Sequence, residues 1–321
     1  MKRRVFVGGA VSAASLLAAG ERRKRRGTAD IPRRNFGKTG ESLTVIGMAG
    51  GRLHMVSSDD AQTVVRRAYD LGINYFDNAH AYGRGRSEEI YGQVLAPFRK
   101  HLFLTSKSGK RTRAEAEAEL YVSMKRLRTD YIDLWQIHAV SEMEDVEKIF
   151  APGGAMEAFE AAHKSGKVRF IGVTGHRDPE VIQEMLKRYK KFDSVMIPVH
   201  AADPAYLSFE KSVLPKAVKH GMGIQGMKNF ANARLLSALT VRECLAYALT
   251  LPIHCTAVGC TTIGQLEDDV RAVTGFKPLD DAEMADLRKR AERVKGPMFE
   301  DWKRNVEVKA GLDPRPEYAG G

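Results

Sequence analysis

Four side chains that can exchange or position protons follow one another in the first half of the sequence: Asp77, Tyr82, Lys107 and His138. A tyrosine is a weak acid near neutral pH, but a nearby ammonium group stabilises the phenolate and lowers its pKa. Lys107 can supply that charge, Asp77 can hold Lys107 in place, and His138 can donate a hydrogen bond to a substrate carbonyl. Such a set protonates an oxygen atom while another species attacks carbon.

The attacking species is expected to come from a cofactor. The sequence contains no nucleophile elbow, no His-Glu-x-x-His motif and no phosphate-binding loop. Hydride carried by a cofactor is therefore the natural candidate. Taken singly, each of the four residues also fits a structural role, as a helix cap, a packing residue, a solvated charge or a buried histidine. Only their joint placement favours chemistry.

From residue 43 onward the chain alternates short apolar runs with amphipathic segments, which predicts parallel strands connected by helices. The predicted strands are residues 44–48, 74–78, 102–107, 132–138, 168–174, 194–199, 223–228 and 255–260. The predicted helices are residues 59–71, 87–95, 112–127, 155–165, 179–189, 209–220, 240–249 and 264–273.

These eight strand and helix pairs predict an α/β fold, a (β/α)8 TIM barrel. A doubly wound sheet is disfavoured because the glycine-rich segment 47–51 lacks the G-x-G-x-x-G spacing, and we interpret it as a tight exit from a strand. Functional residues of such a barrel lie at the carboxyl ends of its strands. Asp77, Lys107 and His138 lie at or near the ends of predicted strands, and Tyr82 follows the first of them, so we expect all four on one rim.

Two segments lie outside the eight predicted strand and helix pairs. Residues 34–43 predict a hairpin that closes the floor of the barrel. Residues 278–294 predict an extra helix with a capping box at its start. The tail beyond it is irregular and contains Phe299, Trp302 and Tyr318. These aromatic residues either cover an active-site mouth or anchor the tail to the barrel wall.

The positive charge is concentrated at one end of the chain. The net charge is +11, and residues 1–34 contain ten of the basic residues but only two acidic ones. The rest of the chain is nearly balanced, which argues against a nucleic-acid partner. The three cysteines have no C-x-x-C spacing, so neither a disulfide framework nor a metal site is predicted. No heptad seam or long apolar edge indicates assembly, and a monomer is the default expectation.

The N-terminus has the order of an export signal. The basic start Lys2-Arg3-Arg4 precedes an apolar run to Ala19, and the paired arginines resemble a twin-arginine signal. We expect a leader over residues 1–30, a single barrel domain over 31–321 and a periplasmic location. The run is too short for a stable membrane span, which needs about 20 residues. An uncleaved tail, on a cytoplasmic or membrane-tethered protein, is the alternative.

Four segments of this sequence resemble the aldo-keto reductases. Residues 76–88, Phe-Asp-Asn-Ala-His-Ala-Tyr-Gly-Arg-Gly-Arg-Ser-Glu, resemble the signature of that family. Residues 104–107, 134–138 and 166–173 resemble its lysine strand, its histidine strand and its fifth strand. The resemblance covers about residues 34–273. It implies that Tyr82 is the general acid, with Lys107, Asp77 and His138 as partners, in hydride transfer from a nicotinamide to an aldehyde or ketone.

The resemblance also implies cofactor-binding residues, although several depart from the family pattern. Where the family commonly has Ser-Asn after strand five, this chain has Thr174, Gly175 and His176; where it has a ring-stacking tyrosine, this chain has Met227 followed by Lys228. These departures resemble a subgroup with V-T-G-H and G-M-K segments. The implied nucleotide-binding segment comprises Gly259, Cys260, Thr261, Thr262, Gln265, Asp268 and Asp269.

A helix that begins near this last segment can hold phosphate through its free backbone N–H groups, and Asp269 can contact adenine. A plain helix cap is the structural alternative. Many members of the family place an arginine near Gln265 to pair with the 2′-phosphate of NADPH. NADPH remains the expected cofactor, with NADH as the alternative.

We therefore expect an NAD(P)H-dependent oxidoreductase that reduces a small-molecule carbonyl substrate. The alternative is a nicotinamide-binding regulatory or accessory subunit with low turnover. The substrate pocket is expected to be shaped by a loop over residues 139–154, by the segment after Lys228 and by the C-terminal tail.

Overall fold

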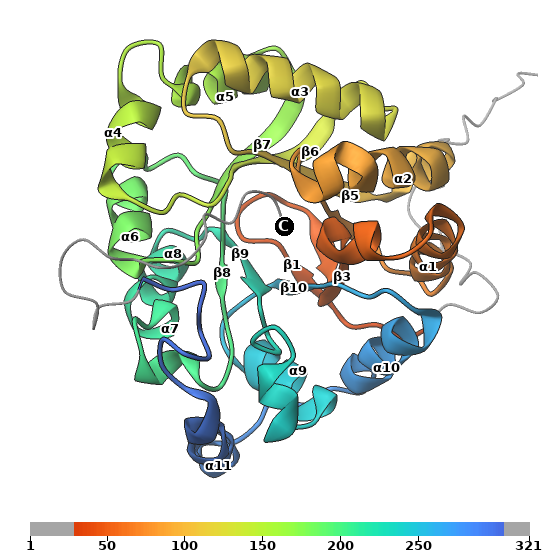
Figure 1. Cartoon of the computed structure of the whole chain (residues 1–321), viewed down its shortest axis with the longest axis vertical. Coiled ribbons are helices and arrows are strands. Elements are labelled where there is room, and N and C mark those ends of the chain that lie inside the picture. The colour runs from red at the N-terminus through yellow and green to blue at the C-terminus, as the bar shows by residue number, and fades with distance from the viewer. Residues whose placement is uncertain (1–28, 305–321) are drawn as a thin grey trace, which may run out of the picture.

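The computed structural model describes residues 29–304, and eight parallel strands among them form a closed barrel (Figure 1). Each strand pairs with the next along the chain, and the last strand pairs with the first to close the ring. The predicted (β/α)8 fold is confirmed. The strands are β3 (Ile46–Ala49), β4 (Tyr75–Asp77), β5 (Phe103–Ser108), β6 (Ile132–Ile137), β7 (Val168–Thr174), β8 (Ser194–Pro198), β9 (Gly223–Met227) and β10 (Cys255–Val258).

Helices surround this ring of strands, as Figure 1 shows. They are α1 (Ser58–Asp70), α2 (Arg86–Leu95), α3 (Arg113–Leu127), α4 (Met143–Phe150), α5 (Ala155–Lys164), α6 (Pro179–Arg188), α7 (Phe209–Ser212), α8 (Leu214–Lys219), α9 (Val241–Thr250), α10 (Ile263–Val273) and α11 (Asp281–Ala291). Short 3-10 turns occur at η1 (Gly50–Met55), η2 (Tyr82–Gly85), η3 (Ala96–His101), η4 (Asp203–Ala205), η5 (Arg234–Ser237) and η6 (Glu292–Val294).

Both faces of the barrel strands are buried, which explains why they appear in the sequence as apolar runs. In β6 all six residues are buried, and its apolar side chains lie in two different surroundings. Trp135 and Ile137 belong to the core between the strands and the helices, and Trp135 stacks on Phe159 of α5 with ring centres 3.7 Å apart. Leu134 belongs to a separate cluster inside the barrel.

The predicted hairpin is present as β1 (Arg33–Asn35) and β2 (Ser42–Thr44), which pair antiparallel. Phe36 in its turn is fully buried and packs edge-on against Phe103 of β5, with ring centres 5.5 Å apart. A Cβ atom on Gly223 would lie 2.6 Å from the Phe36 ring, so only glycine fits there. The hairpin therefore plugs the barrel from below.

Two helix predictions differ from the structure. The single helix expected over residues 209–220 is divided into α7 and α8 at Val213, because Pro215 has no backbone N–H to continue the first helix. Helix α4 lies within residues 139–154, which were expected to be a loop. The extra helix is confirmed as α11, whose capping box joins Asp280 and Glu283.

The predicted leader lies outside the described residues. Within the described part of the chain, no helix combines the length and the apolar character needed to cross a membrane.

Truncation of the hairpin plug should destabilise the whole barrel. We expect Phe36→Ala to lower the free energy of unfolding by about 3–5 kcal/mol, because it removes a buried ring from an enclosed site. Chemical denaturation monitored by circular dichroism measures this change. Val218→Ala, at a position that is 46% exposed on α8, is the control and should change stability by less than about 0.5 kcal/mol. Equal stability of the two variants would contradict the plug.

Candidate active site

The four residues singled out for proton chemistry lie at one rim of the barrel. Asp77 is the last residue of β4, Tyr82 begins η2 in the loop after it, and His138 follows β6. Lys107 is the penultimate residue of β5. Because β4, β5 and β6 are neighbours in the parallel barrel, their carboxyl ends bring these side chains together.

Asp77 and Lys107 form a buried ion pair. The Lys107 ammonium donates to both Asp77 carboxylate oxygens and to the Asn78 carbonyl oxygen, each at 2.7 Å. Each side chain is only 1% exposed. Burial alone would lower the pKa of Lys107, but the Asp77 carboxylate, together with the Tyr82 phenol, holds that pKa above its ordinary value. Lys107 therefore stays an ammonium ion at neutral pH.

Tyr82 lies between this ion pair and His138. The Lys107 nitrogen is 5.2 Å from the centre of the Tyr82 ring, and the rings of Tyr82 and His138 meet edge to face with centres 5.7 Å apart. Burial raises the pKa of the Tyr82 phenol, Lys107 opposes this rise, and Asp77 adds to it. The net direction is upward, which corrects the expectation from Lys107 alone. Tyr82 is thus fully protonated at neutral pH, as a proton donor must be.

His138 is uncharged in this position. Burial lowers its pKa well below the ordinary value, and the charges of Lys107, His176 and Arg111 lower it further. The Arg111 guanidinium donates to the His138 carbonyl oxygen at 3.1 Å and pairs with Asp145 at 3.0 Å. A neutral imidazole can donate one N–H hydrogen bond without adding a second positive charge beside Lys107.

Sequence reasoning missed a layer of polar residues inside the barrel directly beneath this rim. Thr105 donates to Asp77 at 2.8 Å, and the Tyr75 hydroxyl lies 3.5 Å from the same oxygen. Gln225 donates to that hydroxyl at 2.6 Å and accepts from Gln136 at 2.8 Å. These side chains fix the Asp77 carboxylate. A usable signal was present, because Tyr75, Thr105 and Gln136 each precede a site residue by two positions and so share its face of the strand.

The residues expected around the nicotinamide lie at the ends of β7 and β9. The Thr174 hydroxyl accepts from the Ala139 backbone N–H at 2.9 Å, which leaves its own proton free to donate. Gly175 has no room for a side chain, since a Cβ atom would lie 2.3 Å from Ile182. Met227 is the last residue of β9.

His176 and Lys228 are both shifted toward their neutral forms. Burial, with the charges of Lys228 and Arg177, lowers the pKa of His176 to about 3, against a hydrogen bond to the Trp302 backbone that raises it. Burial, with Arg52 and Arg234, lowers the pKa of Lys228 to about 8, against the Asp301 charge. Within residues 29–304 the buried Nδ1 atom of His176 has no hydrogen-bond partner. This site therefore suits a polar ligand group such as a carboxamide.

The segment expected to bind the nucleotide is partly used by the protein itself. Thr262 caps α10 and accepts from the Gln265 backbone N–H at 3.2 Å, while the Gln265 side chain accepts from the Thr261 N–H at 2.9 Å. Gly259 is exposed at the end of β10. This arrangement leaves an exposed, capped helix N-terminus that could hold phosphate.

The two carboxylates expected in this segment have partners within the protein. Asp269 is buried and accepts from the Cys260 thiol at 3.1 Å, and burial raises its pKa to about 6. Asp268 forms an exposed ion pair with Arg271 within the same helix. One oxygen of the Asp269 carboxylate is thus partnered within the protein, and the adenine contact stays a prediction.

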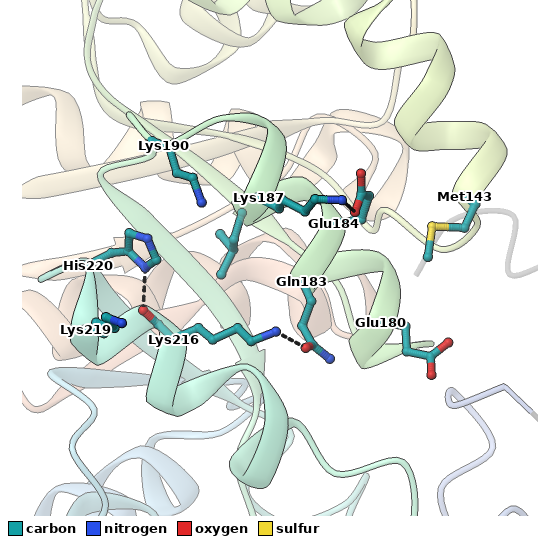
Figure 2. A pocket seen from close by; sticks show the side chains of 10 residues that line it. Met143, Glu180, Gln183, Glu184, Lys187, Lys190, Lys216, Lys219 and His220 are labelled. Carbon is teal, nitrogen blue, oxygen red and sulfur yellow. Dashed lines mark hydrogen bonds and ion pairs between the residues drawn. The ribbon is translucent and has the colours of Figure 1, made fainter.

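A shallow hollow lies on the outer wall of the barrel between α6 and α8, shown in Figure 2. Its lysines are Lys187, Lys190, Lys216 and Lys219, and two of them are partnered, Lys187 by Glu184 and Lys216 by Gln183. None of the lining residues belongs to a barrel strand. It is therefore separate from the rim that holds Tyr82 and Lys107.

Comparison with known proteins identifies the class of protein that this barrel and rim define. The sequence model of the "Aldo/keto reductase family" matches residues 45–240, and this chain belongs to that family. Its members are oxidoreductases that use a nicotinamide cofactor and act on small carbonyl substrates.

Individual relatives are distant. An uncharacterised oxidoreductase of Bacillus subtilis, YqkF, is 30% identical over 168 residues, 49% of this chain and 52% of the relative. Aldo-keto reductase yakc [NADP(+)] of Schizosaccharomyces pombe is 33% identical over 162 residues, 45% of each chain. The chain thus spans about half the length of these relatives. L-galactose dehydrogenase of Arabidopsis thaliana is 26% identical over 78% of this chain and 90% of its own.

Solved structures show the same fold. The holo form of aldo-keto reductase AKR11C1 from Bacillus halodurans superposes with a TM-score of 0.70 at 24% identity. The superposition covers 84% of this chain and 99% of that protein.

The lowered histidine pKa values predict a loss of stability in mild acid. Below about pH 6.5 the unfolded chain takes up protons at His138 and His176 that the folded protein does not bind, so the free energy of unfolding falls. Each histidine contributes at most about 1.4 kcal/mol per pH unit. The fall continues until the folded-state pKa is reached, about 3 for His176.

Denaturation curves between pH 7 and pH 4 measure this loss. We expect His176→Gln to flatten the pH dependence, whereas substitution of the exposed His101 by glutamine should leave it unchanged. An identical slope in wild type and His176→Gln would show that His176 is not held neutral.

Proposed function

We propose that this protein is an NAD(P)H-dependent carbonyl reductase in which Tyr82 delivers the proton. The observation that carries the proposal is the buried Lys107–Asp77 ion pair beside a protonated Tyr82 and a neutral His138. A carboxylate and an ammonium ion removed from water are costly to maintain, and such groups concentrate at functional sites.

Each side chain has a defined part in the reduction. A reduced nicotinamide held at the ends of β7 and β9 would supply the hydride ion for the carbonyl carbon. His138 donates a hydrogen bond to the carbonyl oxygen and orients it. Tyr82 transfers its phenolic proton to that oxygen, which completes the alcohol. The Lys107 ammonium stabilises the resulting phenolate, and Tyr82 regains a proton from solvent.

The cofactor is proposed to be NADPH, with NADH as the alternative. Thr174, Gly175, His176, Met227 and Lys228 would surround the nicotinamide. The exposed N-terminus of α10, near Thr261, Thr262 and Gln265, would hold phosphate. The name of the S. pombe relative, which includes NADP(+), supports the first choice.

Removal of the Tyr82 hydroxyl should abolish reduction without removing the cofactor site. We expect Tyr82→Phe to lower kcat by roughly 10²–10⁴-fold while the Kd for NADPH stays near the wild-type value. The measurement is loss of reduced-nicotinamide absorbance with a panel of aldehydes, ketones and quinones, together with calorimetric binding of NADPH and NADH. Tyr121→Phe, on the exposed face of α3, is the matched control and should retain full activity.

The possible outcomes separate the two functions considered. Equal turnover by wild type and Tyr82→Phe would refute the assigned acid. Cofactor binding without turnover of any carbonyl would favour a nicotinamide-binding accessory subunit instead. The observation that favours this second function is that Thr174 and His176 lie where the family commonly has Ser-Asn.

We further propose export through the twin-arginine pathway, on the sequence of residues 1–30. Expression in a bacterium that has this pathway should yield a mature chain that begins after about Gly20, as measured by intact mass. Conversion of both Arg3 and Arg4 to lysine should leave Met1 in place, whereas the same change at Arg25 and Arg26 should not. An intact Met1 in the wild-type protein would count against export.

A further inference from the structure

The last described residues, 296–304, cross the carboxyl ends of three barrel strands, and we call them the strap. After β7, the Arg304 backbone N–H donates to the Arg177 carbonyl oxygen at 2.8 Å, and the Arg304 side chain pairs with the Asp178 carboxylate at 2.9 Å. After β9, Arg234 pairs with Asp301 through two contacts of 2.8 Å. In Figure 1 the dark blue segment after α11 runs back past α7 and β8.

The strap is anchored by Lys303, whose side chain is fully buried. Its ammonium group donates to Asp203 at 2.7 Å and to the Tyr206 carbonyl oxygen at 2.6 Å, both in the loop after β8. It also pairs with Glu300 at 2.5 Å, within the strap itself. A buried ammonium ion with fixed partners cannot shift without losing them, so this residue sets the position of the strap.

The same cluster resembles a metal site, but Lys303 occupies it. Ligand atoms of His200, Asp203 and Glu300 lie within 4.8 Å of one another, and all three side chains are buried. Lys303 already pairs with both carboxylates, and a divalent cation there would lie beside the ammonium group. The cluster is therefore a structural anchor.

This anchor places the neighbouring Trp302 over the cofactor end of the rim. Trp302 is 5% exposed, and its ring lies 4.9 Å from the Lys228 ammonium and 5.8 Å from the His200 ring. Its backbone contacts His176. Within residues 29–304 the buried indole nitrogen has no hydrogen-bond partner. Trp302 thus contacts both loops at which the nicotinamide is proposed to bind.

We propose that the strap closes over the bound nicotinamide cofactor, with Trp302 in contact with it and Lys303 as the positioning residue. This inference rests on the proposed function. The cofactor then cannot dissociate until the strap moves away, so the contacts of the strap slow the dissociation of the cofactor. Arg234 and Asp301 form a half-buried ion pair at one edge of the strap, and breaking this pair loosens the strap without opening the buried anchor.

Fluorescence of Trp302 tests the contact directly. The chain has two tryptophans, and Trp135→Phe leaves Trp302 as the only one. In this single-tryptophan protein we expect NADPH to quench the indole emission and to accept energy from it, since reduced nicotinamide absorbs where tryptophan emits. Trp302→Leu in the otherwise wild-type protein should abolish that response, because Trp135 lies in the outer wall of the barrel.

Stopped-flow displacement of NADPH tests the closure. We expect Arg234→Ala and Lys303→Met each to raise the dissociation rate roughly tenfold, which corresponds to about 1.4 kcal/mol. Arg290→Ala, which breaks a similarly exposed ion pair to Glu243 away from the strap, is the matched control and should not change the rate. Should Lys303→Met fail to fold, Arg234→Ala keeps the proposal open to test.

Three results would overturn the inference. Binding of NADPH by calorimetry with no change in Trp302 emission would show that the strap does not touch the cofactor, while the proposed function would stand. Faster association with unchanged dissociation in Arg234→Ala would show that the strap blocks entry instead of covering the cofactor. Absence of NADPH binding by the wild-type protein would refute the proposed function itself.

Discussion

The structure depends on keeping one ammonium ion charged inside a barrel. Lys107 lies where water is excluded, and its positive charge persists only because both oxygens of Asp77 and the Asn78 carbonyl are within 2.7 Å. Those partners come from the end of β4, the strand next to that of Lys107, so the two strands must pair in the correct register for the charge to be tolerated. The polar layer of Tyr75, Thr105 and Gln225 then prevents the Asp77 carboxylate from turning away.

A buried lysine with carboxylate partners also holds the strap. Lys303 is a second fully buried lysine, and it too is held by carboxylates and a backbone carbonyl. Lys107 joins adjacent strands and creates the electrostatic environment of Tyr82. Lys303 instead joins the C-terminal segment to the loop after β8, and its effect on the rim passes through Trp302. The environment of Tyr82 at one side of the rim and the position of the strap at the other side thus depend on separate parts of the chain.

The sequence predicted what local patterns can specify. Apolar runs gave all eight barrel strands, and Asp280 with Glu283 marked the start of α11, because these signals lie within a few residues of each other. The rule that functional residues lie at the carboxyl ends of barrel strands predicted the grouping of Asp77, Tyr82, Lys107 and His138. The break at Pro215 could have been predicted from proline alone. Helix α4 was missed because its eight residues make only about two turns, too short a segment to be told from a loop by its period.

Other features depended on tertiary contacts that no local pattern contains. Asp269 looked available for a ligand, but one of its oxygens accepts from the Cys260 thiol. The direction of the Tyr82 pKa shift depended on how deeply the ring is buried, which residue type and spacing do not reveal. The anchor joins Asp203 to a lysine 100 positions further along, so that its partners could not be paired from the sequence.

The order of these parts along the chain has a consequence for protein synthesis. A ribosome releases the strands that hold Asp77, Lys107 and His138 long before it adds β10, and the strap follows last of all the described elements. A polypeptide cut short after α11 would keep every strand and the whole proton-donating set, yet His200 and Asp203 would be left without Glu300 and Lys303. Premature termination or C-terminal trimming would therefore produce a barrel that keeps Asp77, Tyr82, Lys107 and His138 but lacks the strap across its rim.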